Sequence, residues 1–284
     1  MSFKDLLKER LSKELNEQEL SKLPSGFQRI GDIIILNLDE SLKKHKRKIG
    51  EIVLELFKDV RTVCIKEGGI KGEFREPQIE YLAGDKNTET IHIESGIKYN
   101  FDVRKIMFAK GNVSERVRIP KQVKKDEIII DMFAGIGYFS LALGKYSKAK
   151  KIYAIELNPV SFHYLKENIR LNKINNIEAI NGDNREIIDE LINNGIKADR
   201  VILGYLPPPK EFLPWAFKII KKKGIIHYED IINVDNKDKE IERVVEEIRK
   251  VAKDFGYNIK LLLAKCIKGY GPKKDHYVFD VKVE

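Results

Sequence analysis

The stretch "DMFAGIGYFSL", from Asp131 to Leu141, decides the fold class of this chain. It follows an apolar run and places Asp131 at the end of a predicted strand, with Gly135 and Gly137 in the turn before a predicted helix. Glycines let the backbone approach a ligand closely, and the first turn of a helix offers unpaired N–H groups. The stretch therefore predicts a ligand-binding turn, although a tight strand-to-helix turn without a ligand has the same pattern.

From this stretch onward, predicted strands and helices alternate. The strands are expected at 128–133, 151–157, 177–182, 200–206 and 224–230, and the helices near 137–147, 159–172, 184–194 and 211–221. Strands that are apolar on both faces and joined by helices indicate a parallel, doubly wound sheet in an α/β fold. A helix at 237–255 precedes "NIKLLLAKCI" and "HYVFDVKV", which we expect to close the sheet as an antiparallel hairpin.

The first part of the chain has a different pattern. We predict an amphipathic helix over 1–24, a strand at 29–38, a helix at 40–59 and strands at 62–68 and 90–103. The alternation of apolar and polar residues in 90–103 is typical of a half-buried strand. We therefore expect a small α+β domain at 1–118 and a larger α/β domain at 119–284.

Polar residues stand at the ends of two further strands. Glu156 ends the second strand, a position from which a carboxylate binds both ribose hydroxyls of an adenosine. Asp183 and Asn184 follow the third strand, where an adenine would lie, although Asp183 could simply cap the next helix. Because the carboxyl ends of parallel strands meet at one edge of the sheet, these residues predict a nucleoside-binding cleft.

Composition sets broad limits on function. The net charge of +9 over 284 residues favours an anionic partner such as nucleic acid, but heat-adapted proteins share this Lys-rich and Glu-rich composition. No apolar run reaches the length of about 18 residues that a membrane span needs, and the charged N-terminus is unlike a signal peptide. We expect a cytoplasmic protein without membrane association.

The cysteines and histidines give no metal motif. Cys64 and Cys266 have no Cys or His neighbour at metal-ligand spacing, and both lie in apolar strands. We expect both to be buried thiols, as free cysteines usually are. The five histidines are scattered along the chain, so no metal is expected.

Four motifs in order, "DMFAGIGYFSL", "AIELNP", "NGDNRE" and "LGYLPPPKEFL", resemble the Rossmann-like, S-adenosylmethionine-dependent fold of class I methyltransferases. The resemblance implies S-adenosylmethionine as the group donor. An NAD-binding protein is the rival interpretation, but the third position of its GxGxxG pattern is Ser140 here.

Two earlier segments, "FREPQIEYLAGD" and "YNFDVRKIMFAKGNVSERVRI", are similar to the family of tRNA guanine-37 N1-methyltransferases and of the wyosine-pathway enzyme that transfers an aminocarboxypropyl group. The methyltransferases carry an asparagine before Leu-Pro after the fourth strand. This chain has Gly204 and Tyr205 there, as in the aminocarboxypropyl branch, and it begins without the extra N-terminal domain with which the methyltransferases hold the tRNA elbow.

The resemblance implies transfer of the 3-amino-3-carboxypropyl group to C7 of 4-demethylwyosine at position 37 of tRNA(Phe), which leaves 5′-methylthioadenosine. Methylation of guanosine-37 stays open, as does a non-enzymatic tRNA-binding protein that kept the fold. Gly204 could also be only a packing glycine.

The resemblance also implies roles for individual residues. Arg116 is expected to hold the methionine carboxylate in two parallel hydrogen bonds. Glu115 stands at the position of a general base, although proton loss to water could suffice, and Arg75 at the position that steadies a purine oxygen. Tyr205 and Pro207 complete the expected catalytic set. The expected donor contacts are Phe108, Arg116, Asp131, Phe133, Gly135, Glu156, Asn158, Asp183, Asn184, Gly204 and Leu206.

Basic clusters are the candidate contacts for the anticodon stem-loop of tRNA(Phe). They lie at Lys43 to Lys48, at Lys121, Lys124 and Lys125, and at Lys273 and Lys274. Tyr270, Trp215 and Phe217 are candidates for stacking on a splayed base, as single-stranded RNA recognition prefers. Each cluster alone is more often a solvated face, and we expect the protein to be a monomer.

Overall fold

The computed structural model describes residues 1–72, 74–108 and 110–284. The chain divides into two compact units, Met1–Phe108 and Ala109–Glu284. The boundary expected at residue 118 falls inside helix α4 (Val113–Gln122), which packs against α5 (Ser140–Tyr146) of the second unit. The extent of independently folding domains stays a prediction.

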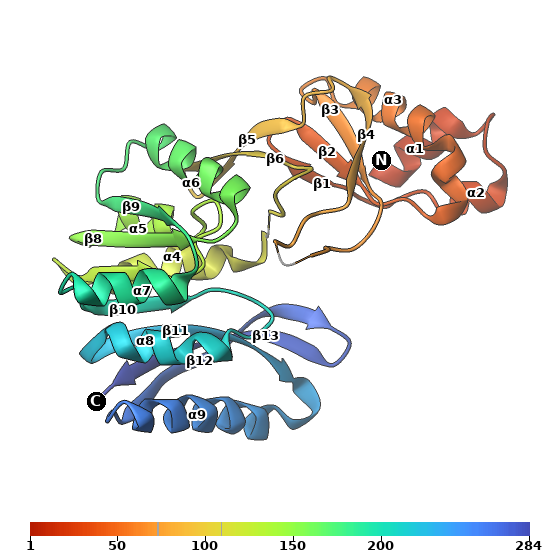
Figure 1. Cartoon of the computed structure of the whole chain (residues 1–284). Coiled ribbons are helices and arrows are strands. Elements are labelled where there is room, and N and C mark those ends of the chain that lie inside the picture. Colours follow the sequence, from red (N-terminus) through yellow and green to blue (C-terminus); the bar gives the residue numbers. More distant parts are fainter. Residues whose placement is uncertain (73, 109) are drawn as a thin grey trace. The chain divides into compact units, whose positions relative to one another are not determined.

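The second unit is built on a seven-stranded sheet with the strand order β12-β13-β11-β10-β7-β8-β9 (Figure 1). The strands are β7 (Ile128–Asp131), β8 (Lys151–Glu156), β9 (Ile177–Asn181), β10 (Ala198–Leu203), β11 (Ile220–Asn233), β12 (Ile259–Gly271) and β13 (Lys274–Val283). The first five pair in parallel, whereas β13 runs antiparallel to both β11 and β12. The predicted α/β fold with its C-terminal hairpin is confirmed.

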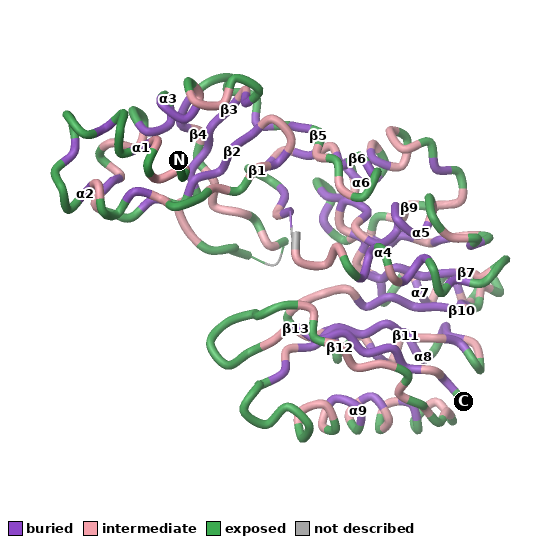
Figure 2. Tube along the Cα trace, turned by 180° about the vertical axis from the view of Figure 1, so that it is seen from behind, coloured by how far each residue is buried: buried purple, intermediate pink, exposed green. Residues whose placement is uncertain are grey.

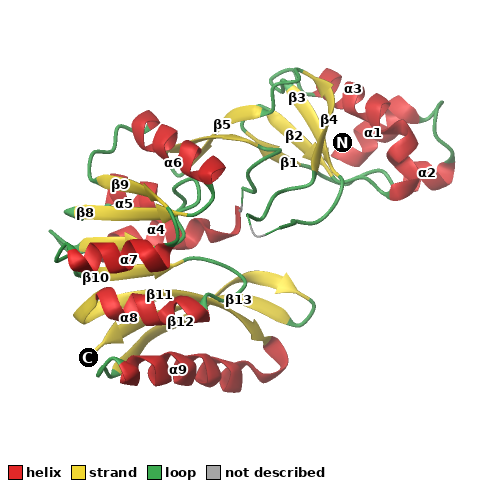
Figure 3. Ribbon diagram, viewed as in Figure 1, coloured by secondary structure: helices red, strands yellow, loops and turns green. Residues whose placement is uncertain are grey.

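Helices cover both faces of this sheet (Figure 3). Helix α4 packs beside α5 on one face, while α7 (Asn184–Asn193), α8 (Leu213–Ile219) and α9 (Lys237–Asp254) pack in a row on the other. Helix α6 (Pro159–Leu171) lies over β8 and β9. The central strands are buried almost throughout (Figure 2), which explains their apolar, β-branched sequences.

The first unit is an α+β structure. Its four-stranded sheet has the order β1 (Gln28–Ile30), β2 (Ile33–Leu36), β3 (Thr62–Lys66) and β4 (Ile79–Gly84), and a separate hairpin joins β5 (Glu89–Glu94) to β6 (Ile97–Asp102). Its helices are α1 (Phe3–Leu11), α2 (Glu17–Ser21), the 3-10 turn η1 (Glu40–His45) and α3 (Lys46–Leu56).

Some expected elements are divided in the structure. The predicted helix over 1–24 is two helices, because Asn16 caps a new helix through a capping box with Glu19. The run at 90–103 is a hairpin that turns at Ser95 and Gly96, both with positive φ.

The two cysteines have different surroundings. Cys64 is buried as expected, and burial raises the pKa of its thiol to about 12. Cys266 is exposed, so the expectation that it is a buried thiol is wrong. Its place in β12, one of the two edge strands of the sheet, accounts for this, because no further strand lies beside it on one side.

None of the helices within the described residues combines the length and the apolar composition needed to cross a membrane.

Candidate S-adenosylmethionine site

The glycine turn after β7 is held by a buried hydrogen bond. Gly135 and Gly137 have φ angles of 56° and 99°, which L-residues with side chains rarely adopt. The Ser140 hydroxyl donates to Asp131 Oδ2 at 2.6 Å, so the serine in the third position fixes the turn from inside. Asp131 has no exposed surface, and burial raises the pKa of its carboxyl to about 6.

Glu156 connects the end of β8 to this turn. Its carboxylate accepts hydrogen bonds from the backbone N–H of Gly135 at 2.7 Å and of Asn158 at 2.8 Å. The Asn158 side chain in turn caps α6 by accepting from Val160 N. Burial raises the pKa of Glu156 to about 7. The predicted ribose-binding carboxylate is therefore fixed at the turn where the donor is expected.

The two residues after β9 have different roles. Asp183 caps α7 by accepting from Arg185 N and pairs with the Arg185 guanidinium, which is the structural role considered for it above. Asn184 is 6% exposed and donates to Met132 O at 2.9 Å. Among the described residues its Oδ1 has no hydrogen-bond partner. A buried acceptor in this place fits an N–H donor of a bound ligand.

The segment after β10 packs against the glycine turn. The Tyr205 ring stacks on Phe133 with 5.0 Å between centroids and 17° between planes. A Cβ on Gly204 would lie 2.5 Å from the Phe139 ring, so this position has a packing reason to be glycine. Its role in directing the reaction stays a prediction.

Helix α4 supplies the two residues expected to act on the substrate and on the donor tail. Glu115 is fully buried, with Oε2 accepting from Arg118 Nε at 2.7 Å and Oε1 from Lys265 Nζ at 3.0 Å. Arg116 is 4% exposed, and its guanidinium lies 4.9 Å from the centroid of the Tyr138 ring. Both oxygens of the candidate base are thus engaged by cations.

A chain of buried charges extends from Glu115 across the sheet. Arg118 makes a two-pronged ion pair with Asp280 at 2.5 and 2.9 Å. Asp280 accepts from His227 Nδ1 at 2.6 Å, and Arg200 donates to His227 Nε2 at 2.6 Å. Since arginine cannot accept, His227 is neutral with its proton on Nδ1. Burial lowers the pKa of His227, in keeping with this assignment.

Two predicted site residues lie in the first unit. Phe108 stacks on Phe101 with 5.1 Å between centroids, in an aromatic cluster under the β5–β6 hairpin. Arg75 has a positive φ of 56°. Their expected contacts with the donor and with a purine oxygen stay predictions.

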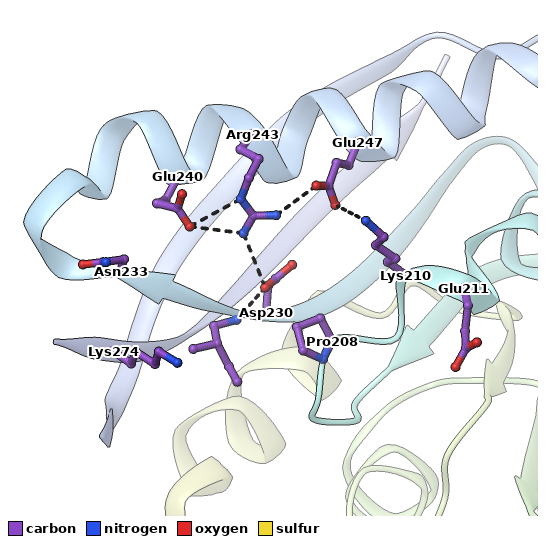
Figure 4. Close-up of a pocket in the computed structure, with 10 residues that line it drawn as sticks. Pro208, Lys210, Glu211, Asp230, Asn233, Glu240, Arg243, Glu247 and Lys274 are labelled. Carbon is purple, nitrogen blue, oxygen red and sulfur yellow. Dashed lines mark hydrogen bonds and ion pairs between the residues drawn. The ribbon is translucent and has the colours of Figure 1, made fainter. Parts of the chain in front are cut away.

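A pocket of about 580 Å³ lies at the carboxyl ends of β10 and β11, on the face covered by α9 (Figure 4). Arg243 crosses it and pairs with Glu240 at 3.3 Å, with Glu247 at 3.0 Å and with Asp230 at 3.8 Å. Lys210, which follows the three prolines at 207–209, pairs with Glu247. Its charged groups largely neutralise one another, and within the described residues no three His, Cys, Asp or Glu side chains are grouped as metal ligands.

The structure weakens part of the expected RNA footprint. Each basic side chain from Lys43 to Lys48 lies within ion-pair distance of a carboxylate, with Glu19 and Glu67 each serving two of them. Phe217 is 1% exposed in the core, so the expectation that it stacks on a base is wrong. Tyr270 is 45% exposed near the tip of the β12–β13 hairpin.

Sequence reasoning did not identify Arg118, Lys265, Asp280 or His227 as supports of Glu115. The one local signal was the spacing of Glu115 and Arg118, which places both on one side of a helix. The other partners come from β12, β13 and β11, far away in sequence.

Donor affinity should depend on pH because of Glu156. Burial raises the pKa of Glu156 to about 7, so the carboxylate form, which we expect to accept the ribose hydroxyls, predominates only above about that pH. We expect affinity for S-adenosylmethionine to rise from pH 6 to pH 8, with a slope below pH 7 approaching about tenfold per unit. Titration calorimetry measures this, and Glu156→Gln should remove the slope. A constant wild-type affinity over this range would contradict the assignment.

Comparison with known proteins places the chain in a family. Residues 90–260 match the model of the TRM5/TYW2 methyltransferase domain, and residues 7–88 match that of the TYW2 N-terminal domain. The chain is 42% identical over 282 residues to the tRNA(Phe) (4-demethylwyosine(37)-C(7)) aminocarboxypropyltransferase of Pyrococcus horikoshii, which covers 99% of this chain and 97% of that protein.

Two solved structures are similar throughout. The crystal structure of P. horikoshii TYW2 in complex with MeSAdo has a TM-score of 0.82 at 38% identity and covers 99% of both chains. That of Trm5b from Pyrococcus abyssi has a TM-score of 0.80 at 37% identity and covers 95% of this chain and 78% of the other. The chain therefore belongs to the TRM5/TYW2 family.

Proposed function

We propose that this protein transfers the 3-amino-3-carboxypropyl group of S-adenosylmethionine to C7 of 4-demethylwyosine at position 37 of tRNA(Phe), releasing 5′-methylthioadenosine. The observation that carries this is similarity over nearly the full length to relatives of that activity, 42% identical in P. horikoshii and 41% in Methanocaldococcus jannaschii. Solved TYW2 structures hold MeSAdo and AdoMet. The protein is an S-adenosylmethionine-dependent transferase of wyosine synthesis.

The residues at the carboxyl edge fit the donor. Glu156 accepts the ribose hydroxyls, and the unpartnered Asn184 Oδ1 accepts an adenine N–H. Gly135 and Gly137, which have positive φ and no side chain, let the methionine part of the donor approach the protein backbone closely. We assign the remaining contacts to Phe108, Asp131, Phe133, Asn158, Asp183, Gly204 and Leu206.

Arg116 is the residue we assign to the methionine carboxylate. Its planar guanidinium can bind both carboxylate oxygens in parallel, which holds the tail in one orientation. The Tyr138 ring beneath it restricts the side chain. Such restraint matters because a sulfonium has three electrophilic carbons, and only the one in line with the nucleophile reacts fast.

Residues after β10 are assigned to the substrate side of the site. We assign Tyr205 and Pro207 to the wall of the base site and Arg75 to a purine oxygen. Location in the cytoplasm and a monomeric state are part of this proposal.

Methylation of guanosine-37 is the second candidate. It is favoured by 38% identity to P. abyssi Trm5b over 94% of this chain, and by the packing reason for Gly204. The nucleoside product separates the two. We expect tRNA carrying 4-demethylwyosine to gain the mass of an aminocarboxypropyl group, and tRNA carrying guanosine-37 to stay unmodified. Methylation of guanosine-37 alone would decide for the second candidate.

RNA binding should depend on the β12–β13 hairpin. Lys268 and Lys274 are exposed on this hairpin. Both lie further along the sheet than the carboxyl end of β10. Replacing both by glutamine should reduce the slope of log affinity against log salt by about two, one for each phosphate that is no longer neutralised. Tyr270 between them offers a ring for stacking.

A matched control lies at the opposite edge. Lys124 and Lys125, candidate RNA contacts by sequence, are exposed immediately before β7, at the amino ends of the parallel strands and so at the edge opposite the expected donor site. Their replacement by glutamine should leave the slope unchanged. If replacing Lys124 and Lys125 reduces the slope and replacing the hairpin lysines does not, the RNA does not bind at the β12–β13 hairpin.

A further inference from the structure

The buried residues Glu229 and His276 and the partly buried Asn112 form a polar cluster beside the donor site, with no role in the function proposed so far. Glu229 on β11 is 5% exposed and His276 on β13 is 1% exposed. His276 Nε2 lies 3.1 Å from Glu229 Oε2. Asn112, from the "NVSER" segment, donates from Nδ2 to Glu229 Oε1 at 3.1 Å. Carboxylate, imidazole and amide thus converge from three separate segments.

The imidazole of His276 lacks hydrogen bonds. Within the described residues neither of its ring nitrogens completes one, although Nε2 is close to Glu229. His227, the other buried histidine of this sheet, has partners at both nitrogens. A buried polar group without a partner is costly and calls for a reason. Catalytic hydrogen bonds are often poorly aligned until the substrate binds.

Strand register places the cluster near the carboxyl end of β10. Leu203, the last residue of β10, pairs with Tyr228, so Glu229 stands beside Gly204. His276 pairs with Ile231, one strand further along. Two strand spacings of about 4.8 Å and an offset of two residues of about 3.3 Å each put the His276 backbone about 12 Å from Gly204. The charge of Glu229 also contributes to the raised pKa of Asp131, after the larger effect of burial.

The cluster shares a face of the sheet with Glu115. Side chains alternate along a strand, so Glu229 points to the same side as His227. His227 contacts Asp280, which pairs with Arg118 of α4. That is the face over which α4 presents the candidate base.

We propose that His276, oriented by Glu229, is the catalytic proton acceptor of the reaction; this rests on the proposed function. The C7 electron pair attacks Cγ of the methionine part, and the Cγ–S bond pair stays on sulfur, which leaves neutral 5′-methylthioadenosine. The positive charge passes to the ring of the base. His276 Nδ1 then takes the C7 proton, and the C–H electrons restore the ring. Glu229 stabilises the imidazolium.

This assignment replaces Glu115 as the proton acceptor. Both Glu115 oxygens already hold cations, Arg118 and Lys265, so a proton arriving there must compete with two ion pairs. A neutral imidazole has a free lone pair that can take a proton. In this arrangement Asn112 fixes the orientation of Glu229, which gives the first residue of "NVSER" a role in positioning.

The test uses His276→Gln in the full chain, with tRNA carrying 4-demethylwyosine. Turnover should fall by about a hundredfold or more, the range for a positioned proton-transfer group. Calorimetric affinity for S-adenosylmethionine should stay unchanged, which also shows that the variant is folded. With deuterium at C7, a primary isotope effect absent in the wild type should appear. Glu229→Gln should give the same effect more weakly, and added imidazole should restore part of the activity of His276→Ala.

The matched control is His227→Gln, which removes the other buried histidine of the same face. Any loss of turnover there should come without an isotope effect, and imidazole should not rescue His227→Ala. Wild-type turnover in His276→Gln, or loss in both variants without isotope effect or rescue, would overturn the assignment while leaving the proposed function intact. Failure of the wild type to modify 4-demethylwyosine would overturn both.

Discussion

Arg118→Met should lower the free energy of unfolding of the Ala109–Glu284 unit by about 3–5 kcal/mol, the cost of removing one partner from a buried ion pair. Arg118 holds the carboxylates of Glu115 and Asp280, both of which are buried. Burial alone would raise the pKa of Asp280, but hydrogen bonds from Arg118 and His227 lower it well below its usual value. Its charge therefore persists at neutral pH and loses its main partner in the variant.

Arg249→Met is the matched control for this measurement. Arg249 also pairs with a glutamate three residues earlier on a helix, but its side chain is 41% exposed. Exposed pairs contribute at most about 1 kcal/mol. Trp215, the one tryptophan of the chain, lies in α8 of this unit and reports its unfolding in urea by fluorescence. Equal decreases in the free energy of unfolding in the two variants would contradict a stabilising role of the buried ion pairs of Arg118.

Glu156→Ala should weaken binding of S-adenosylmethionine by about 1.5–3 kcal/mol, the scale of hydrogen bonds to a charged group. Two interactions are removed together. The ribose hydroxyls lose their acceptor, and the Gly135 N–H loses the carboxylate that fixes the glycine turn. Titration calorimetry at pH 8, where the carboxylate form predominates, measures the change.

Glu178→Ala controls for the loss of a carboxylate from the same sheet. Glu178 lies on β9 and pairs with Lys151 at the surface, away from the carboxyl edge. Its removal should leave donor affinity unchanged. If Glu156→Ala binds as tightly as this control, the ribose assignment is wrong.

The placement of three polar residues at one edge of the sheet was predictable because it depends on topology. Once strands and helices alternate, the ends of β7, β8 and β9 must meet at one edge, and Asp131, Glu156 and Asn184 stand at those ends. The hydrogen bonds of Glu156 to the glycine turn agree with this reasoning. The hairpin of β12 and β13 followed in the same way from two apolar runs around a turn.

Interactions between distant segments could not be predicted. Arg118 and Asp280 are 162 residues apart, and no local pattern indicates that they pair. The basic run from Lys43 to Lys48 looked like an RNA surface because Glu19 and Glu67, which each pair with two of its side chains, come from other elements. Phe217 was misjudged for a related reason, since helical periodicity gives the apolar face of α8 but not what covers it.

The central claim is that the enzyme presents Cγ of the methionine part, and not the methyl group, to its nucleophile. A difference of about 1.4 kcal/mol in alignment already gives a tenfold preference, and a tail held by Arg116 should give far more. The most direct test is chromatography of the small-molecule product after incubation with S-adenosylmethionine and tRNA carrying 4-demethylwyosine. We predict 5′-methylthioadenosine, in an amount equal to the modified base. S-adenosylhomocysteine as the main product would contradict the account and make the protein a methyltransferase.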